Sequence, residues 1–449
     1  MDNEAFDLVV VGGGSGGLAC AQAAAGHGAR TLLIEGAELG GTCVNRGCVP
    51  KKLLWKAAKT VQQTADMGRQ GLVDTQAPYD LARHQHWASR KIASIRDSYR
   101  DRLTEAGVTL RRGWASIDAE GQVTLDGATI DARHVVLATG GQPIMLDMDG
   151  ADLMVDSSDV LSWTARPERI VIVGAGYIGC EFASIFAALG SRVDIVNDTP
   201  DLLEGFDRDA VAVIDRVFRR RGVTCHMECE PRSLQRVDDG LRLTLDDGRS
   251  IEADAVICAV GRRPDLPSLG PIGERLHMAD NGTVAVDEAF RTNVEGVHAI
   301  GDLADRLPLT PVAIRDGRTL ARLLFAPDDG PDRLDLDHVA TGAFTIPPLA
   351  QVGRVREGEA SPPGCAIHAG HVSPIQNGVL MPDAQGEDAN YHKLVVEAGR
   401  MVGAALVSDD AADTIAGLAA MVSLGSHHAG LCRPAPIHPT FAEEFFGED

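Results

Sequence analysis

The sequence predicts an α/β protein in which two repeated βαβ units are followed by an α+β domain at the C-terminus. The segments "FDLVVVGGGSGGLACAQAAAGHGARTLLIEG" and "ERIVIVGAGYIGCEFASIFAALGSRVDIVND" share one order of apolar strand, glycine turn, helix and second strand. From about Asp335 onward, strand-like stretches interrupted by proline precede the helix-like "DTIAGLAAMVSLGS". The repetition indicates two domains of like construction, and the later change of pattern indicates a third.

The glycine spacing of the two units indicates nucleotide binding. The pattern G-x-G-x-x-G places its glycines at Gly12, Gly14 and Gly17 in the first unit and at Gly174, Gly176 and Gly179 in the second. The first glycine of each set makes the tight turn, the second admits a pyrophosphate, and the third packs the helix against the strand. Because the first unit also ends in Glu35, placed to bind ribose hydroxyls, the sequence predicts two Rossmann-like dinucleotide sites.

Three shorter segments extend these sites. "HVVLATGG" follows the first unit, "DAVICAVGRRPD" follows the second, and "GVHAIGDLA" is an apolar strand that ends in an acid able to bind a ribityl or ribose hydroxyl. The residues predicted from them to contact the cofactors are Thr139, Gly140, Gly261, Arg262, Gly301 and Asp302.

Composition narrows the classes of function. A chain of 449 residues with 44% hydrophobic residues should form roughly three domains. Its formal net charge of −22 repels phosphate backbones, which argues against a nucleic-acid partner. The start "MDNEAFDLVVVGGG" is acidic where a secretory leader would be basic, and no apolar run approaches the ~18 residues that span a bilayer. We therefore expect a cytoplasmic protein with no membrane segment.

The stretch "GGTCVNRGCVPKK" holds two cysteines, Cys43 and Cys48, just after the first βαβ unit. A zinc site would need about four ligands, and no second pair stands at matching spacing, so we expect no metal. Nine cysteines scattered over a chain in a reducing compartment argue against a structural disulfide. Lys51 supplies positive charge that favours a thiolate. The pair is therefore predicted to be redox-active, relaying electrons from a nicotinamide through a flavin.

The stretches "GGTCVNRGCVPKK", "GGGSGG", "GAGYIGCE", "AIGD" and "HPTFAEE" resemble the pyridine nucleotide-disulfide oxidoreductases, most closely the glutathione reductase branch. The resemblance extends over nearly the whole chain in the same order. It implies an FAD domain over residues 1–145 and 265–333, an NAD(P) domain over 146–264, and a dimerisation domain over 334–449.

The resemblance also implies the catalytic residues. Cys48 resembles the cysteine that faces the flavin and forms the charge-transfer thiolate, and Cys43 the interchange thiol that attacks the substrate disulfide. His438 with Glu443 resembles an acid-base dyad supplied by the partner subunit, so the implied working unit is a homodimer with shared active sites. This fits the chemistry, because the thiolate expelled by Cys43 needs a proton and a carboxylate can hold the imidazole tautomer that supplies it.

Other implied contacts lie beside the cofactors. Lys51 and Glu181 resemble an ion pair near the flavin, and Tyr177 an aromatic lid over the nicotinamide pocket. Ser15 and Thr42 complete the residues implied to contact the FAD.

The substrate cleft departs from the glutathione reductase pattern. Ser15, Tyr99 and Arg318 fall where glutathione reductases contact the disulfide. Gln22, however, stands in place of an arginine that pairs with a glycine carboxylate, and Lys91 in place of a second tyrosine. The loss of a charge-assisted bond at Gln22 predicts glutathione disulfide or a modified relative, such as its amide, as the substrate.

The stretch "RVDIVNDTPDLLEGFD" after the second unit predicts NADH rather than NADPH as the hydride donor. Asp198 and Glu204 stand where NADPH-specific members carry arginines, and two carboxylates repel a 2′-phosphate. Asn197 and Asp198 can instead accept hydrogen bonds from ribose hydroxyls. Arg192 and Arg208 are the side chains that could reverse this preference by turning toward a phosphate.

Three alternatives stay open from the sequence. The first is an NADPH-dependent glutathione reductase, and the second is a dihydrolipoamide dehydrogenase of a multienzyme complex, against which "GCVPKK" and Tyr99 argue. The third is a flavoprotein scaffold or redox sensor without turnover, against which the intact Cys43, Cys48 and His438 argue.

Overall fold

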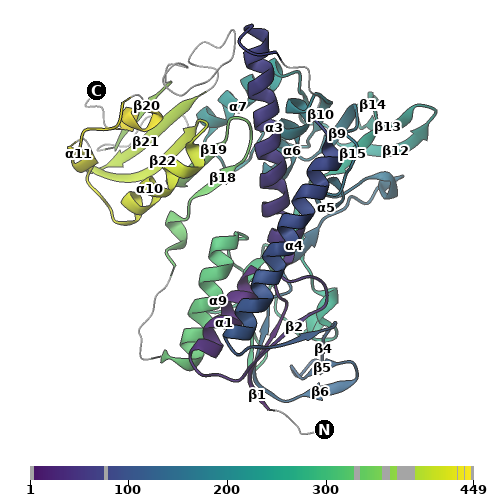
Figure 1. The fold of residues 1–449 in the computed structure, drawn as a ribbon, viewed down its shortest axis with the longest axis vertical. Helices are drawn as coiled ribbons and strands as arrows, with labels where there is room; N and C mark the ends of the chain where they lie inside the picture. Colours follow the sequence, from purple (N-terminus) through teal and green to yellow (C-terminus); the bar gives the residue numbers. More distant parts are fainter. Residues whose placement is uncertain are drawn as a thin grey trace. The chain divides into compact units, whose positions relative to one another are not determined.

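The computed structural model describes residues 5–74, 79–327, 334–355, 365–371, 390–431, 433–438 and 440–445. These residues fall into two compact bodies, each discontinuous in sequence (Figure 1). The N-terminal body comprises Met1–Lys51, Arg83–Ile144 and Arg262–Leu334. The C-terminal body comprises Lys52–Ala82, Met145–Gly261 and Asp335–Asp449.

A five-stranded parallel sheet in the order β17-β7-β1-β2-β3 forms the centre of the N-terminal body. Its strands are β1 (Phe6–Val11), β2 (Thr31–Glu35), β3 (Thr109–Arg112), β7 (Ala132–Leu137) and β17 (Val297–Ala299). The other elements are α1 (Ser15–Gly26), α2 (Gly41–Asn45), α4 (Leu81–Glu105), α8 (Ile272–Arg275), α9 (Thr310–Phe325), β4 (Ser116–Ile117), β5 (Val123–Leu125), β6 (Ala128–Ile130), β8 (Gly141–Pro143) and β16 (Arg262–Pro264). Helix α3 (Cys48–Arg69) begins in this body and continues into the next.

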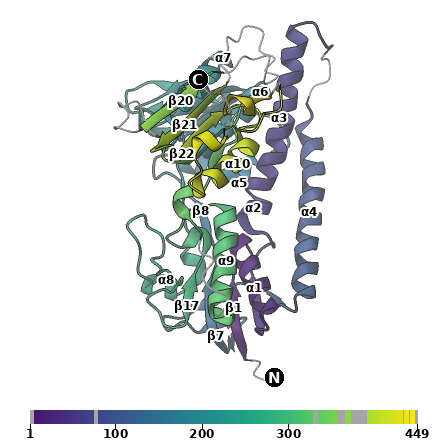
Figure 2. The same ribbon diagram turned by 90° about the vertical axis from the view of Figure 1, so that its left-hand side faces the viewer.

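Both faces of this sheet are buried, which explains the unbroken apolar run of β1. Val9 and Val11 pack into the core on one face, and Leu8 and Val10 into the core on the other, as expected for a strand whose side chains alternate. On the second face α1 and α9 lie side by side (Figures 1 and 2). Their contact is close because a Cβ atom at Gly317 would lie 2.4 Å from the Gly16 carbonyl oxygen.

The C-terminal body holds a second parallel sheet in the order β11-β10-β9-β15. Its strands are β9 (Arg169–Val173), β10 (Arg192–Val196), β11 (Thr224–His226) and β15 (Ala255–Cys258), accompanied by α5 (Ser157–Val160), α6 (Tyr177–Ala188), α7 (Arg208–Arg220), and the antiparallel strands β12 (Pro231–Val237), β13 (Gly240–Leu245) and β14 (Ser250–Ala253). The strand–glycine turn–helix–strand order of the first sheet recurs here, which confirms the predicted α/β class with two Rossmann-like folds.

The last part of the chain forms an antiparallel sheet in the order β18-β19-β22-β21-β20. Its elements are β18 (Thr341–Ala343), β19 (Leu349–Gly353), β20 (Cys365–Gly370), β21 (Tyr391–Glu397), β22 (Arg400–Val407), α10 (Ala411–Ser423) and α11 (His428–Leu431). Helix α10 packs on β22 and β19, which makes this the predicted α+β part. Within the described ranges, no helix is long and apolar enough to cross a membrane.

Candidate active site

The first glycine turn is shaped by close backbone contacts. Gly12 follows β1 with φ of 110°, and a Cβ atom there would lie 2.4 Å from the Ala138 carbonyl oxygen. A Cβ atom at Gly17 would lie 1.9 Å from the Gly12 oxygen, so only glycine allows α1 to approach the turn. The N-cap of α1 is Gly14, which makes no side-chain cap bond, and the first N–H groups of α1, from Ser15, therefore face the turn. This arrangement suits a pyrophosphate.

The acid that ends β2 is held against the same turn. One carboxylate oxygen of Glu35, Oε2, accepts the Gly13 N–H at 2.6 Å, and Oε1 accepts the Ala37 N–H at 2.7 Å. An ionised carboxylate has about four acceptor positions, so Glu35 keeps capacity for ribose hydroxyls.

The second glycine turn repeats this geometry. Gly174 has φ of 107°, and a Cβ atom there would lie 2.5 Å from the Ala259 carbonyl oxygen. A Cβ atom at Gly179 would lie 2.0 Å from the Gly174 oxygen. Gly176 is the N-cap of α6, again without a side-chain cap bond. The two turns therefore have matched geometry in separate sheets, and the second suits an anion as the first does.

Beyond β10, the charged side chains of residues 197–204 are all acidic. Asn197 accepts the Ala175 N–H through Oδ1 at 2.9 Å and donates through Nδ2 to the Thr199 hydroxyl at 2.7 Å. Asp198 and Glu204 are exposed. The amide of Asn197 thus holds the turn itself, which leaves the two carboxylates facing solvent.

The two arginines near this stretch are both paired with acids. Nε of Arg192 lies 3.3 Å from an oxygen of Asp194, and Nη2 of Arg208 lies 3.4 Å from an oxygen of Asp201. Each of these pairs draws its guanidinium toward an acid of the same stretch.

The cysteine pair lies against the first glycine turn. Cys43 is on α2 and Cys48 is the first residue of α3. Gly40 and Gly41, with φ of 98° and 56°, bend the chain into α2, and a Cβ atom at Gly41 would lie 2.7 Å from the Gly14 Cα. Two glycines are therefore needed to bring the cysteine segment onto the dinucleotide turn.

The pKa values of the two thiols are shifted in opposite directions. The hydrogen bond from Cys43, together with the Thr310 hydroxyl and the charge of Lys51, lowers the pKa of Cys48 to about 6. The same bond to Cys48, followed by burial, raises the pKa of Cys43 well above its usual range, although hydrogen bonds from Thr310 and Ser15 oppose the rise. Cys48 is therefore the thiolate and Cys43 the protonated donor near neutral pH.

Arg262 connects several predicted cofactor contacts of the N-terminal body. Its Nη2 lies 3.4 Å from the Thr42 hydroxyl and also donates to the Gly141 carbonyl oxygen. Burial raises the pKa of Asp302, and the positive charge of Arg262 opposes that rise. Asp302 follows Gly301 at the end of β17, beside the sheet edge that carries the first turn. The remaining predicted contacts follow the ends of β7 and β15, at Thr139, Gly140 and Gly261.

Helix α6 carries two of the predicted catalytic residues. Tyr177, its first residue, is 46% exposed. Glu181 is 4% exposed, and its carboxylate accepts the Phe344 N–H at 2.8 Å. Lys51 belongs to the other body, so its ion pair with Glu181 stays a prediction.

The predicted dyad is formed near the end of the described chain. Nδ1 of His438 lies 2.7 Å from an oxygen of Glu443. Phe441, between them in sequence, is buried in the core of the α+β part, which holds this segment in place. The His438 side chain is 75% exposed, so the ring is accessible to a partner or substrate. Since the Glu443 carboxylate accepts a hydrogen bond from Nδ1–H, Nε2 is the basic nitrogen of the neutral ring.

The predicted substrate residues lie on helices of the N-terminal body. Gln22 is on α1, Arg318 on α9 and Tyr99 on α4. Burial is the main cause that raises the pKa of Tyr99. Lys91 is exposed on α4.

Sequence reasoning did not identify Thr310. Its hydroxyl lies 3.6 Å from the Cys48 sulfur, although the two residues are 262 positions apart. The Thr310-Pro311 pair signals a helix start, which indicates the first turn of α9 but not its neighbour.

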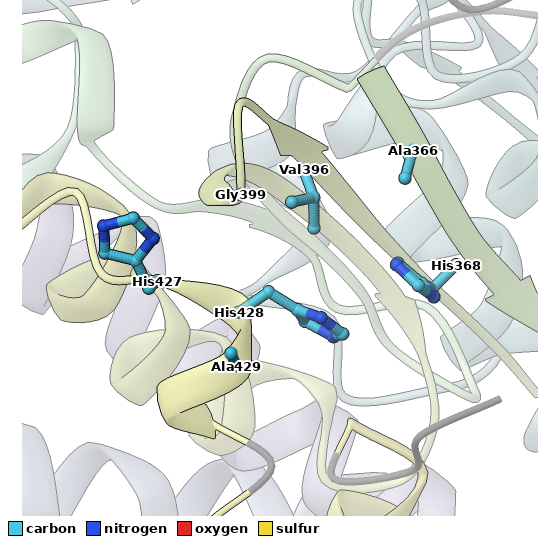
Figure 3. Close-up of a pocket in the computed structure, with 7 residues that line it drawn as sticks. All are labelled: Ala366, His368, Val396, Gly399, His427, His428 and Ala429. Carbon is cyan, nitrogen blue, oxygen red and sulfur yellow. The ribbon is translucent and has the colours of Figure 1, made fainter. Parts of the chain in front are cut away.

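The α+β part carries a surface pocket (Figure 3). The rings of His368 and His428 stack at 4.5 Å, whereas His427 points elsewhere. The pocket is lined by Ala366, His368, Val396, Gly399, His427, His428 and Ala429. None of the predicted site residues lines it. In the parts of the chain that the structure describes, no group of three or more His, Cys, Asp or Glu side chains is arranged to hold a metal ion.

Comparisons with known proteins agree with this geometry. Residues 6–317 match the pyridine nucleotide-disulphide oxidoreductase family, and residues 339–447 match the dimerisation domain of that family. Over 457 residues the chain is 35% identical to a glutathione reductase of Burkholderia cepacia, covering 99% of this chain and 98% of the relative. A glutathione reductase of Yarrowia lipolytica is 32% identical over 467 residues, covering 98% of each chain. A chloroplastic/mitochondrial glutathione reductase of Pisum sativum is 31% identical over 461 residues, covering 98% of this chain and 81% of the relative.

Proposed function

The chain belongs to the pyridine nucleotide-disulphide oxidoreductases and is an FAD-dependent NAD(P)H disulfide reductase of the glutathione reductase branch; we propose that its electron donor is NADH and its acceptor glutathione disulfide or a modified relative. The observation that carries this proposal is the Cys43–Cys48 pair on the first glycine turn, with the thiolate at Cys48. A cytoplasmic location is part of the proposal and rests on the sequence.

The residues present fit FAD in the N-terminal body. Gly12 leaves a cradle that any Cβ atom would fill, the start of α1 faces it, and Glu35 stands at the ribose end. Bound there, FAD supplies the ring system that passes the electrons of the nicotinamide to the disulfide. The chain itself orients this group through the turn and through Arg262 and Asp302.

The donor is NADH because of the charges beyond β10. Asp198 and Glu204 are exposed, and the resemblance puts them where NADPH-specific relatives carry the arginines that bind a 2′-phosphate. At ~5 Å with an effective dielectric near 20, each repulsion between such a phosphate and a carboxylate would cost about 3 kcal/mol before screening. Arg192 and Arg208 are engaged by acids of their own. A free ribose hydroxyl, in contrast, can donate to Asp198.

Because the pKa of Cys43 is raised and that of Cys48 is lowered, the two thiols have different roles in the reaction. Cys43 is protonated, so it needs a base before it can attack; the partner subunit's His438 takes that proton through Nε2. The Cys43 thiolate attacks the substrate disulfide, forming a mixed disulfide and releasing one thiolate, which His438 protonates. Cys48 then attacks the Cys43 sulfur, which forms the Cys43–Cys48 disulfide and releases the second thiolate. The substrate gains two electrons, and the dithiol loses them.

The dyad requires a dimer in this proposal. The match to a dimerisation domain supports a homodimer, and a two-fold axis gives two equivalent shared sites. Glu443 keeps the Nδ1 proton of His438 in place, so Nε2 carries the proton transfers.

Steady-state assays with both nicotinamides and a panel of disulfides test the proposal. The panel contains glutathione disulfide, the disulfide of glutathione amide, and oxidised lipoamide. We expect a larger kcat/KM with NADH than with NADPH and efficient turnover of one of the first two disulfides. A preference for NADPH would overturn the donor assignment. A preference for lipoamide would indicate the dihydrolipoamide dehydrogenase alternative. If no disulfide were turned over, the protein would be a non-catalytic flavoprotein.

A further inference from the structure

Trp114 lies at the ligand edge of the first parallel sheet. Strand β3 pairs with β2 so that Arg112 is opposite Glu35, and the Gly113 N–H donates to the Glu35 carbonyl oxygen at 3.0 Å. Trp114 is the next residue, so it stands just beyond the carboxyl ends of two neighbouring strands. In open parallel sheets this edge is where ligands bind.

One face of the Trp114 indole covers Gly36. A Cβ atom at Gly36 would lie 2.4 Å from the indole Cδ2 and 2.7 Å from Cε2, so any side chain there would displace the ring. Gly36 is outside the positive-φ residues, and its backbone alone does not demand glycine. Glycine at position 36 is therefore required by the indole that packs on it.

The rest of the indole is open. Trp114 is 69% exposed, an unusual exposure for a ring that carries so much apolar surface. Trp87, on α4, is exposed to 41% and has no comparable glycine beneath it. A flat aromatic surface fixed on one side and free on the other suits stacking with a second flat group.

The backbone beneath the ring is held by several contacts. Nη2 of Arg112 donates to the Ala37 carbonyl oxygen at 2.8 Å and lies 3.3 Å from an oxygen of Glu38. Arg96 reaches the other oxygen of Glu38 at 3.2 Å. Glu35, one residue before Gly36, is the acid at the ribose end of the dinucleotide turn. A ribose bound at Glu35 would carry its base toward the segment that begins with Gly36, which the indole covers.

We propose that Trp114 is the wall of the FAD site against which the adenine stacks. This assignment concerns this chain's own side chain and is independent of which nicotinamide or disulfide the enzyme uses. In this assignment Trp114 is a binding residue and does not take part in the redox step.

FAD retention and a fragment titration together test the assignment. Full-length Trp114→Ala holoenzyme should lose FAD ~10- to 100-fold faster than the wild type, because it lacks the ring on which the base stacks. The loss is measured after dilution from the fluorescence of free flavin. Trp114→Phe should recover most of the retention, and the control Trp87→Ala should match the wild type. Gly36→Ala should weaken retention as well, because its Cβ displaces the indole.

The titration uses the flavin-free full-length chain and keeps the test decisive if a variant folds poorly. ADP, which carries the adenine, should quench tryptophan emission in the wild type and in Trp87→Phe, but not in Trp114→Phe. FMN, which lacks the adenine, should leave the Trp114 emission unchanged. An ADP response that survives in Trp114→Phe, or no ADP response in the wild type, overturns the assignment.

Discussion

The two glycine turns share a backbone and differ in the side chains that follow. Gly12 and Gly174 have φ of 110° and 107°, and a Cβ atom at each would lie 2.4 Å and 2.5 Å from a carbonyl oxygen of a neighbouring strand end. The strand-end side chains are equivalent too, because Glu35 and Asn197 each accept the N–H of the middle residue of their turn. The two repeats thus share the hydrogen bond that holds the turn. We expect exposed side chains nearby, such as Asp198, to discriminate between ligands.

The clearest difference is that only the first turn is followed by a cysteine pair. Gly41 presses against Gly14 there, which brings Cys43 and Cys48 to the FAD turn and to Thr310. The second turn is followed instead by the acidic stretch with Asp198. In the proposed function, one scaffold serves a resident redox group, and the other a donor that must bind and leave.

Removing a thiol should have the largest effect. Cys43→Ser and Cys48→Ser should each lower disulfide reductase turnover by about 10⁴-fold, as expected for loss of a nucleophile. Cys225→Ser is the control, because burial raises the pKa of Cys225 to about 11 and keeps it a thiol. Absorbance spectra separate the two sulfurs: Cys43→Ser should keep a long-wavelength thiolate-to-flavin band, and Cys48→Ser should lack it. A band retained in Cys48→Ser would reverse the assignment.

Alanine at the two turn glycines should separate their cofactors. Gly12→Ala should be purified with little FAD, whereas Gly174→Ala should keep FAD and show a KM for NADH raised by about 10- to 100-fold, since positive φ and the carbonyl contact together cost about 1–3 kcal/mol. Gly28→Ala is the control, with φ of 87° but nothing within 4 Å of its Cβ. Flavin-to-protein absorbance and steady-state kinetics measure both. Equal flavin contents in the two turn variants would contradict separate roles.

Reversing the charge beyond β10 should shift donor preference. Asp198→Arg should raise the ratio of kcat/KM for NADPH to that for NADH by about 10-fold or more, because it replaces a repulsion by a charge-assisted hydrogen bond. Asp238→Arg makes the same charge change in the exposed turn between β12 and β13. That turn lies at the opposite edge of the sheet, where Arg169, the first residue of β9, donates to the Asp239 carbonyl oxygen. If both variants shift the ratio equally, net charge rather than a local contact sets the preference.

The smallest expected effect is a decrease in the free energy of unfolding at acidic pH. His298 is buried on β17, and burial, followed by the charge of His134, lowers its pKa to about 4. Its unfolded pKa is near 6.5, so stability is complete above about pH 6.5 and falls as pH drops toward 4, because the unfolded chain binds the proton first. The loss should be about 2 kcal/mol at pH 5 and negligible at pH 7.5. In the second sheet His226, on β11, lies 2.9 Å from an oxygen of Asp194.

Denaturant unfolding at the two pH values, followed by flavin release, measures this difference. His298→Phe should reduce the pH dependence, whereas His27→Phe, at the exposed end of α1, should leave it unchanged. A wild-type midpoint that is the same at pH 5 and pH 7.5 would contradict the neutral His298.

Local sequence determined the fold class and the two dinucleotide turns. Apolar strands, a G-x-G-x-x-G turn and the helix after it are contiguous, so Gly12, Gly17, Gly174 and Gly179 could be predicted from their spacing alone. The Cys43–Cys48 pair is equally local, lying in one turn and the helix start that follows. The family resemblance supplied the dyad, and the structure brings His438 and Glu443 within 2.7 Å because they too are close in sequence.

Contacts between distant segments were decided only by the tertiary structure. Thr310 meets Cys48, Ala138 closes over Gly12, and Trp114 covers Gly36 because parallel strands and their connecting helices bring separate segments to one sheet edge. Strand order and register depend on which buried faces pack together, and no single segment encodes that. The lowered pKa of Cys48 was likewise decided by the tertiary structure, because it depends in part on the Thr310 hydroxyl that the fold places beside the sulfur.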